Sequence, residues 1–194
     1  MKILIADDDQ SVVKSFKLIL KDAGYSVVGV AHDGMEAVEM ASSLRPDLIL
    51  MDIKMPRMDG INAARIINGS ESRDGLIPII LVTAYAEQQL VQKAKSCGVL
   101  GYLVKPVHVD DIVPAIELAH NTAQTINALE GVVENLTEEL EARKLIEKAK
   151  GILMRHLSIH EDDAMRMMQK ESRKQRIKMK DLAQAIIASH SVLA

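Results

Sequence analysis

Aromatic residues are scarce in this chain of 194 residues, which has three tyrosines, one phenylalanine and no tryptophan. Rows of bases stacked on aromatic rings are therefore excluded, and any nucleic-acid surface must rely on charge and polar contacts. The single cysteine, Cys97, cannot form an internal disulfide. A disulfide-stapled secreted scaffold is thus excluded, and a reducing cytosol is expected.

Long apolar runs are absent as well. No run reaches the roughly 18 residues of a membrane-spanning helix. Hydrophobic residues still make up 48% of the chain, enough for a packed core. The opening segment, MKILIADDD, places three acids directly after a short apolar run, whereas a signal peptide needs a longer one. We therefore expect a cytoplasmic protein without membrane contact, folded as one domain or two small ones.

Charge is distributed unevenly along the chain. Residues 1–120 carry 12 bases and 16 acids, and residues 121–142 carry five acids and no base. Residues 143–180 carry 12 bases and five acids. Such blocks are compatible with solvated helix faces. Their size and separation nevertheless favour two modules with different partners, of which the basic one suits nucleic acid.

Strand and helix patterns alternate over the first 120 residues. Five short apolar runs are bounded by Gly, Pro or Asp and separated by helix-length stretches: Ile3–Ala6, Val27–Val30, Leu48–Met51, Ile79–Val82 and Gly101–Val104. Buried parallel strands have this continuous apolar character, and right-handed crossovers connect them. The pattern predicts an α/β fold: a doubly wound, flavodoxin-like, five-stranded parallel sheet with helices on both faces.

Polar side chains follow the ends of these strands. Asp7 and Asp8 follow the first strand, Asp52 the third, Thr83 the fourth and Lys105 the fifth. Ligands bind at the carboxyl edge of such a sheet, where neighbouring carboxylates repel each other unless a cation neutralises them. We therefore predict a Mg²⁺ site, with a lysine and a hydroxyl beside it that suit phosphate oxygens. The competing interpretation is that the acids only form turns.

Four motifs occur in order over this region, namely IADDD, LILMDIKMPRMDG, LVTAYAE and GYLVKP. In these motifs residues 1–120 resemble a two-component response-regulator receiver domain. The resemblance implies that a sensor histidine kinase phosphorylates Asp52. It also implies that Mg²⁺ is held by Asp7, Asp8, Asp52 and the backbone carbonyl of Lys54.

The same resemblance implies a switch beside the phosphoryl group. Thr83 and Lys105 hold the phosphoryl oxygens, and Tyr102 swings inward as Thr83 moves. The Lys105–Pro106 peptide bond is expected to be cis. Binding the new dianion then biases a two-state surface on the fourth and fifth strands, so the product is a switch rather than turnover.

A long helix is expected after the receiver-like region, with residues 121–142 as a coiled-coil connector. Apolar residues recur at alternating steps of three and four from Ile112 onward. The predicted dimer seam comprises Ile126, Leu129, Val133, Leu136 and Leu140. Alternatively, the seam packs on its own receiver or tail. Acids along residues 130–141 repel across a dimer, so we expect homodimers chiefly in the phosphorylated state.

Residues 143–194 have the pattern of an all-α three-helix bundle. A first helix ends near His156, and a third contains Leu182 and Ile186. Ser158 and Glu161 form an S-x-x-E capping box that starts the second helix. The stretches AKGILM and LAQAII resemble an ANTAR domain, the RNA-binding module of transcription antitermination regulators. The resemblance implies binding to paired RNA stem-loops that compete with a terminator. Met165 and Ser172 depart from the family pattern, which usually has an aromatic residue and an alanine there.

Basic residues at helical spacing support that expectation, because each phosphate contact releases counterions. The predicted RNA-binding residues are Lys148, Lys150, Arg155, Arg166, Lys170, Arg173 and Lys174. Two other functions compete with a phosphorylation-controlled antiterminator. A DNA-binding response regulator requires a helix-turn-helix, but no glycine lies between the second and third tail helices. A metal-dependent phosphohydrolase requires an acid/base pair that the sequence does not offer.

Overall fold

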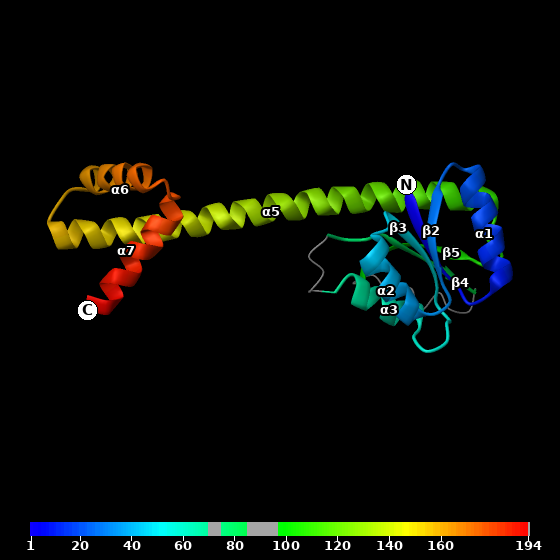
Figure 1. Cartoon of the computed structure of the whole chain (residues 1–194). Helices are drawn as coiled ribbons and strands as arrows, with labels where there is room; N and C mark the ends of the chain where they lie inside the picture. Colours follow the sequence, from blue (N-terminus) through cyan, green and yellow to red (C-terminus); the bar gives the residue numbers. More distant parts are fainter. Residues whose placement is uncertain (70–74, 85–96, 194) are drawn as a thin grey trace. The chain divides into compact units, whose positions relative to one another are not determined.

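The structure is a computed structural model that describes residues 1–69, 75–84 and 97–193 (Figure 1). The chain forms two compact units, Met1–Leu129 and Glu130–Ala194. None of the helices within the described ranges is long and apolar enough to span a membrane.

A five-stranded parallel sheet forms the centre of the first unit. Its strands are β1 (Lys2–Ala6), β2 (Ser26–Ala31), β3 (Leu48–Asp52), β4 (Ile79–Thr83) and β5 (Val99–Val104). Their order is β2-β1-β3-β4-β5, and every neighbouring pair is parallel. The predicted α/β fold is thus confirmed, with all five expected strands present.

Helices cover both faces of this sheet (Figure 1). On one face, α1 (Gln10–Asp22) and the start of α5 pack against Ile3 and Ile5. On the other face, α2 (Gly34–Leu44) and α3 (Gly60–Ile67) pack against Leu4 and Ala6. Successive residues of a strand point to opposite faces, so a fully apolar strand is buried from both sides.

Helix α5 runs without interruption over Val109–Leu157, 49 residues. Ile112 and Ala119, which belong to the apolar pattern read from the sequence, are buried in the core of the first unit. The start of the helix therefore packs on the receiver of its own chain, which is the alternative interpretation of the apolar pattern. Asn127 extends this attachment, because its side-chain amide exchanges two hydrogen bonds with the backbone of Leu76, at 2.8 and 3.2 Å.

The second unit combines the last turns of α5 with α6 (Glu161–Gln175) and α7 (Met179–Leu193). Ala149, Met168, Leu182 and Ala183 form its buried centre. Three helices are present as predicted, but the first is the end of α5 rather than a separate helix. Ser172 is buried, and its hydroxyl donates to the carbonyl of Ile177 at 2.7 Å. This polar contact accounts for a serine at a position where alanine is usual.

The predicted capping box at the start of α6 is wrong. The residue that precedes the helix as its N-cap is His160, and no side chain caps the helix there. Ser158 lies earlier, in a left-handed backbone conformation with φ of 52°. Glu161 accepts a hydrogen bond from the Lys150 ammonium at 2.6 Å. The Glu161 carboxylate is thus used in an ion pair with α5 rather than in a capping box.

Candidate functional site

The strand register brings the polar residues together at the carboxyl edge of the sheet. Ala6 pairs with Met51, so Asp7 and Asp52 follow neighbouring strands at the same level. On the other side of β3, the backbone N–H of Lys105 donates to the carbonyl of Thr83 at 2.8 Å. The carboxyl ends of β1, β3, β4 and β5 therefore lie at one edge of the sheet, with Asp7, Asp52, Thr83 and Lys105 at these ends or directly after them.

Lys105 connects the two buried carboxylates. Its Nζ lies 2.5 Å from Asp52 Oδ1 and 3.0 Å from Asp7 Oδ2. Asp7 is 1% exposed and Asp52 is 7% exposed. Two carboxylates this deeply buried repel each other, and the shared ammonium compensates that repulsion. The site therefore consists of two buried carboxylates that share one ammonium group.

Burial and the neighbouring charges act in opposite directions on the pKa of Asp52 and on the pKa of Lys105. Burial raises the pKa of Asp52 above its ordinary value, and the hydrogen bond from Lys105 only partly offsets that effect. Burial also disfavours the charged form of Lys105, but the hydrogen bonds to Asp52 and Asp7 outweigh it and raise the pKa of the ammonium. Lys105 thus stays positively charged at neutral pH.

The donor set suits a hard divalent cation. The carboxylates of Asp7 and Asp52 already converge on one cation, the ammonium of Lys105. Mg²⁺ usually keeps several waters and needs only one or two carboxylates together with phosphate oxygens. Asp8 is exposed, and no three His, Cys, Asp or Glu side chains in the described part of the chain are placed to share a metal. Asp9, the third acid of IADDD, is instead the N-cap of α1.

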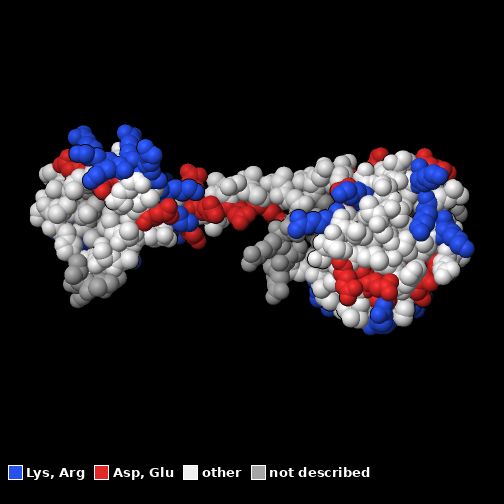
Figure 2. Space-filling model, viewed as in Figure 1, with Lys and Arg blue, Asp and Glu red and all other residues white. Residues whose placement is uncertain are grey.

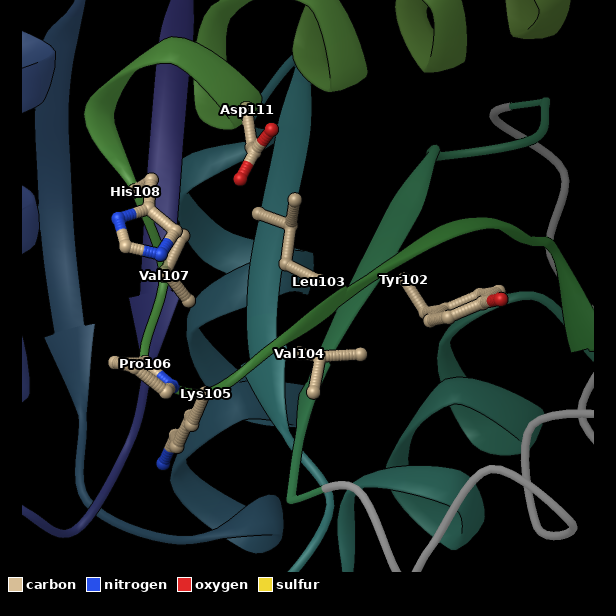
Figure 3. A pocket seen from close by; sticks show the side chains of 8 residues that line it. All are labelled: Tyr102, Leu103, Val104, Lys105, Pro106, Val107, His108 and Asp111. Carbon is tan, nitrogen blue, oxygen red and sulfur yellow. The ribbon is translucent and has the colours of Figure 1, made fainter.

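Thr83 and Tyr102 occupy different environments. Thr83 is fully buried, and its hydroxyl donates to the carbonyl of Ala84 at 3.0 Å. Tyr102 is 50% exposed and points away from Lys105 (Figure 3). Tyr102 lines an open pocket of about 530 Å³, which residues 102–108 and Asp111 surround. Thr83 lies on β4, where it pairs with Val104 of β5. The Lys105–Pro106 bond is cis, as expected. The end of the LVTAYAE motif, from Tyr85 on, lies outside the described residues.

The loop between β3 and α3 carries Asp52 at its start and Lys54 two residues later. Gly60 closes this loop by donating its backbone N–H to the carbonyl of Ile53 at 2.9 Å. The loop also contacts α2 through Arg57, which forms ion pairs with Asp33 and Glu36. No pattern in the sequence pairs Arg57 with these two acids. Only Asp33, a residue type that typically caps the start of a helix, could have indicated part of this contact.

Basic side chains gather over α6 in the second unit (Figure 2). Arg166, Lys170, Arg173 and Lys174 are all exposed there, and Lys148 and Arg155 are exposed on α5. Lys150 differs from this expectation. It is 8% exposed, and its ammonium is bound to Glu147 at 2.7 Å and to Glu161 at 2.6 Å. The Lys150 ammonium is paired with two carboxylates of the same unit, so it is not free to contact an RNA phosphate.

Comparison with known proteins agrees with both halves of this description. The response regulator receiver domain family matches residues 3–117, and the ANTAR domain family matches residues 134–187. The transcriptional regulatory protein PdtaR of Mycobacterium tuberculosis is 42% identical over 186 residues, which cover 96% of this chain and 89% of that protein. The chain belongs to the response regulators that carry an ANTAR domain.

Solved receiver domains share the fold of the first unit of this response regulator. The receiver of a modulated diguanylate cyclase from Desulfovibrio desulfuricans is 33% identical, with a TM-score of 0.57 over 64% of this chain and 96% of that chain. The receiver of a sensor histidine kinase from Pseudomonas aeruginosa is 31% identical, with a TM-score of 0.55 over 62% of this chain and 97% of that chain. Its crystal structure contains a magnesium ion coordinated in the active-site cleft.

Family membership decides the general function. The chain is an ANTAR-containing antiterminator regulated by its receiver domain, and it accepts a phosphoryl group rather than catalysing turnover as an enzyme. Receiver domains are phosphorylated by histidine kinases, and ANTAR domains bind RNA. The phosphohydrolase and DNA-binding alternatives are therefore not supported.

Proposed function

We propose that Asp52 is the phosphoacceptor of this response regulator and that its phosphorylation controls RNA binding by the tail. The observation that carries this proposal is the contact of Lys105 with both Asp52 and Asp7. A permanently charged ammonium beside a buried carboxylate is suited to hold the phosphoryl oxygens once that carboxylate is modified.

The chemistry follows from these contacts. A carboxylate oxygen of Asp52 attacks the phosphorus of a phosphohistidine, the P–N bond breaks, and an acyl phosphate forms. Asp7, Asp8, Asp52 and the backbone carbonyl of Lys54 would hold Mg²⁺, which would supply neutralising charge for the transferring group. Lys105 moves its hydrogen bond from Asp52 to a phosphoryl oxygen.

The switch follows from the same change. Because Thr83 is buried, its hydroxyl leaves the Ala84 carbonyl only when a stronger acceptor such as a phosphoryl oxygen is present. The displacement of Thr83 vacates space beside β4, and Tyr102 turns inward from its exposed position. The resulting change on the β4 and β5 surface is what the rest of the chain responds to.

Acetyl phosphate with Mg²⁺ tests the first part of the proposal. Wild-type protein should gain one phosphoryl group in intact-mass spectrometry, and EDTA should abolish the gain because the carboxylates then repel the donor. Asp52→Asn should stay unlabelled. Asp47→Asn, which removes an exposed carboxylate that binds the backbone of Lys2, is the matched control and should label normally. Labelling of Asp52→Asn, or labelling that ignores EDTA, contradicts the assignment.

For the output, we propose that phosphorylation pairs two chains through α5, so that two tails reach two stem-loops on one transcript. The three exposed leucines and the exposed valine of the predicted seam support this pairing: Leu129 is 59%, Val133 62%, Leu136 54% and Leu140 59% exposed in the single chain. Ile126, the first seam residue, is half-buried. The expected partners of the chain are a sensor histidine kinase and a nascent transcript. We expect the chain to act in the bacterial cytoplasm, where both occur.

Salt dependence tests which basic residues contact RNA. Replacing Lys170 and Arg173 by Ala should weaken binding of a two-stem-loop RNA and reduce the slope of log K against log salt by roughly one unit per lost contact. Replacing Lys14 and Lys17 by Ala removes the same number of charges from exposed positions of α1 in the receiver and should leave that slope unchanged. Equal slopes for wild type and the Lys170/Arg173 variant contradict an RNA surface on α6.

Comparing RNAs tests the pairing itself. Phosphorylated protein should bind a transcript with two stem-loops far more tightly than one with a single stem-loop, since the second contact is intramolecular. Equal affinity for the two RNAs, or a preference for duplex DNA of any sequence, contradicts the proposed mode of action.

A further inference from the structure

We propose that Arg57 is a positioning residue for phosphorylation: it fixes the loop between Asp52 and α3 in the conformation that binds the divalent cation. This inference rests on the proposed role of Asp52 and Lys54. Arg57 touches neither carboxylate of the Asp7–Asp52 pair and acts through the loop that it belongs to.

The loop is fastened near the site by its own backbone and at its apex by α2. The hydrogen bond from Gly60 to Ile53 closes it near Asp52. At the apex, the Gly34 N–H at the start of α2 donates to the Met58 carbonyl at 3.1 Å. Lys54, whose carbonyl is the proposed cation ligand, lies between these two attachments. Its position therefore depends on both of them.

Arg57 itself has an unfavourable backbone conformation. Its φ is 61°, and the Met58 N–H donates to the Pro56 carbonyl at 2.6 Å, across Arg57. This is the hydrogen bond of a γ-turn with a positive central φ, a rare and strained arrangement for a residue with a side chain. Such strain persists only where the surroundings hold the residue in place.

The side chain of Arg57 supplies that restraint. Its guanidinium pairs with Asp33 and with Glu36, the latter at 2.9 Å. The Asp33 side chain is 3% exposed and also accepts the backbone N–H groups of Met35 and Glu36 at 2.8 and 3.0 Å. Glu36 is held in turn by the backbone N–H of His32 at 2.9 Å. Because Asp33 and Glu36 are both fixed to the first turn of α2, the apex of the loop is anchored to a rigid helix end.

Cation affinity and loop protection in the full-length protein test the inference together. Mn²⁺ serves as the probe in place of Mg²⁺, and its free concentration is measured by electron paramagnetic resonance. Arg57→Ala should weaken Mn²⁺ binding on the order of tenfold, the usual effect of removing a residue that orients a ligand. It should also accelerate hydrogen exchange of the amides in residues 53–59. Neither readout requires phosphorylation.

Matched variants separate positioning from general damage. Arg65→Ala removes an exposed arginine of α3 that hydrogen-bonds only locally, to Asn62 at 2.8 Å, and should change neither readout. Arg57→Lys keeps one ion pair and should restore part of the affinity. Asp33→Asn retains the oxygen that caps α2 but loses the charge, so adding Arg57→Ala to it should have a smaller effect than in the wild type, because only the pair with Glu36 is left to lose.

The outcomes are distinguishable from failure of the proposed function. If Arg57→Ala matches Arg65→Ala in Mn²⁺ affinity and in exchange of residues 53–59, Arg57 is not a positioning residue. If wild type binds Mn²⁺ but acetyl phosphate never labels Asp52, the phosphoacceptor assignment fails while the positioning result stands. If Arg57→Ala does not fold, Arg57→Lys and Asp33→Asn decide the question by the same two measurements.

Discussion

Gly60 shows at the scale of one residue how closely the phosphoacceptor loop is packed. A Cβ added there would lie 2.1 Å from the backbone carbonyl oxygen of Asp52 and 3.0 Å from the side chain of Met51. Backbone atoms of a buried strand cannot move away cheaply. Glycine is therefore required at this position, because α3 begins directly against the residue that we propose to be phosphorylated.

We expect Gly60→Ala to displace Asp52, to destabilise the protein by roughly 1–3 kcal/mol as an overpacked core does, and to slow labelling by acetyl phosphate. Urea unfolding and intact-mass spectrometry measure the two effects. Gly131→Ala is the control, because its Cβ has nothing within 4 Å. That change should favour α5 by about 1 kcal/mol and leave labelling unaffected. Normal labelling of Gly60→Ala contradicts the steric argument.

At the scale of elements, one ion triad joins α6 to the end of α5. The Lys150 ammonium binds Glu147 on its own helix and Glu161 on α6. The hydrogen bonds from Glu147 and Glu161 raise the pKa of Lys150, and the hydrogen bond from Lys150 lowers the pKa of Glu161. The triad thus holds the start of α6, which lacks a capping side chain, against α5.

The sign of the resulting pH dependence follows from linkage. Glu161 has an ordinary pKa of 4.5 and a lower one when folded, so the unfolded chain binds more protons in this range. The contact is fully formed above pH 4.5 and is lost as pH falls through the lowered folded pKa. In an NMR titration, the Glu161 carboxyl carbon should have its midpoint below 4.5, and Lys150→Met should return it toward the ordinary value. A midpoint that Lys150→Met leaves unchanged contradicts the pairing.

At the scale of the whole molecule, α5 belongs to both units and is the physical link between receiver and tail. Up to Asn127 its inward face is held by the receiver. Between residues 129 and 140 the seam residues Leu129, Val133, Leu136 and Leu140 are exposed in the single chain, and a row of acids lies beside them. Apolar burial favours pairing of two chains while acid repulsion opposes it, and we therefore expect phosphorylation of the receiver to shift the balance toward the dimer.

Leu136→Glu should therefore abolish the increase in dimer that phosphorylation produces, because it places a charge in the seam. Sedimentation velocity with and without acetyl phosphate measures the dimer fraction. Leu118→Glu makes the same exchange at another exposed leucine of α5, outside the predicted seam, and should leave the increase intact. A protein that is monomeric both before and after phosphorylation rules out the seam.

Local patterns in the sequence determined the strands, the parallel sheet, the long helix and the three tail helices, because burial on both faces and helical periodicity are properties of neighbouring residues. They also predicted that Asp7, Asp52, Thr83 and Lys105 meet, since parallel strands end at one edge. Only the tertiary structure decided how charges pair across distant segments. Lys150 turns inward to Glu161, and Arg57 reaches Asp33, because partner choice depends on which helix ends lie close in space, a property that no local pattern contains.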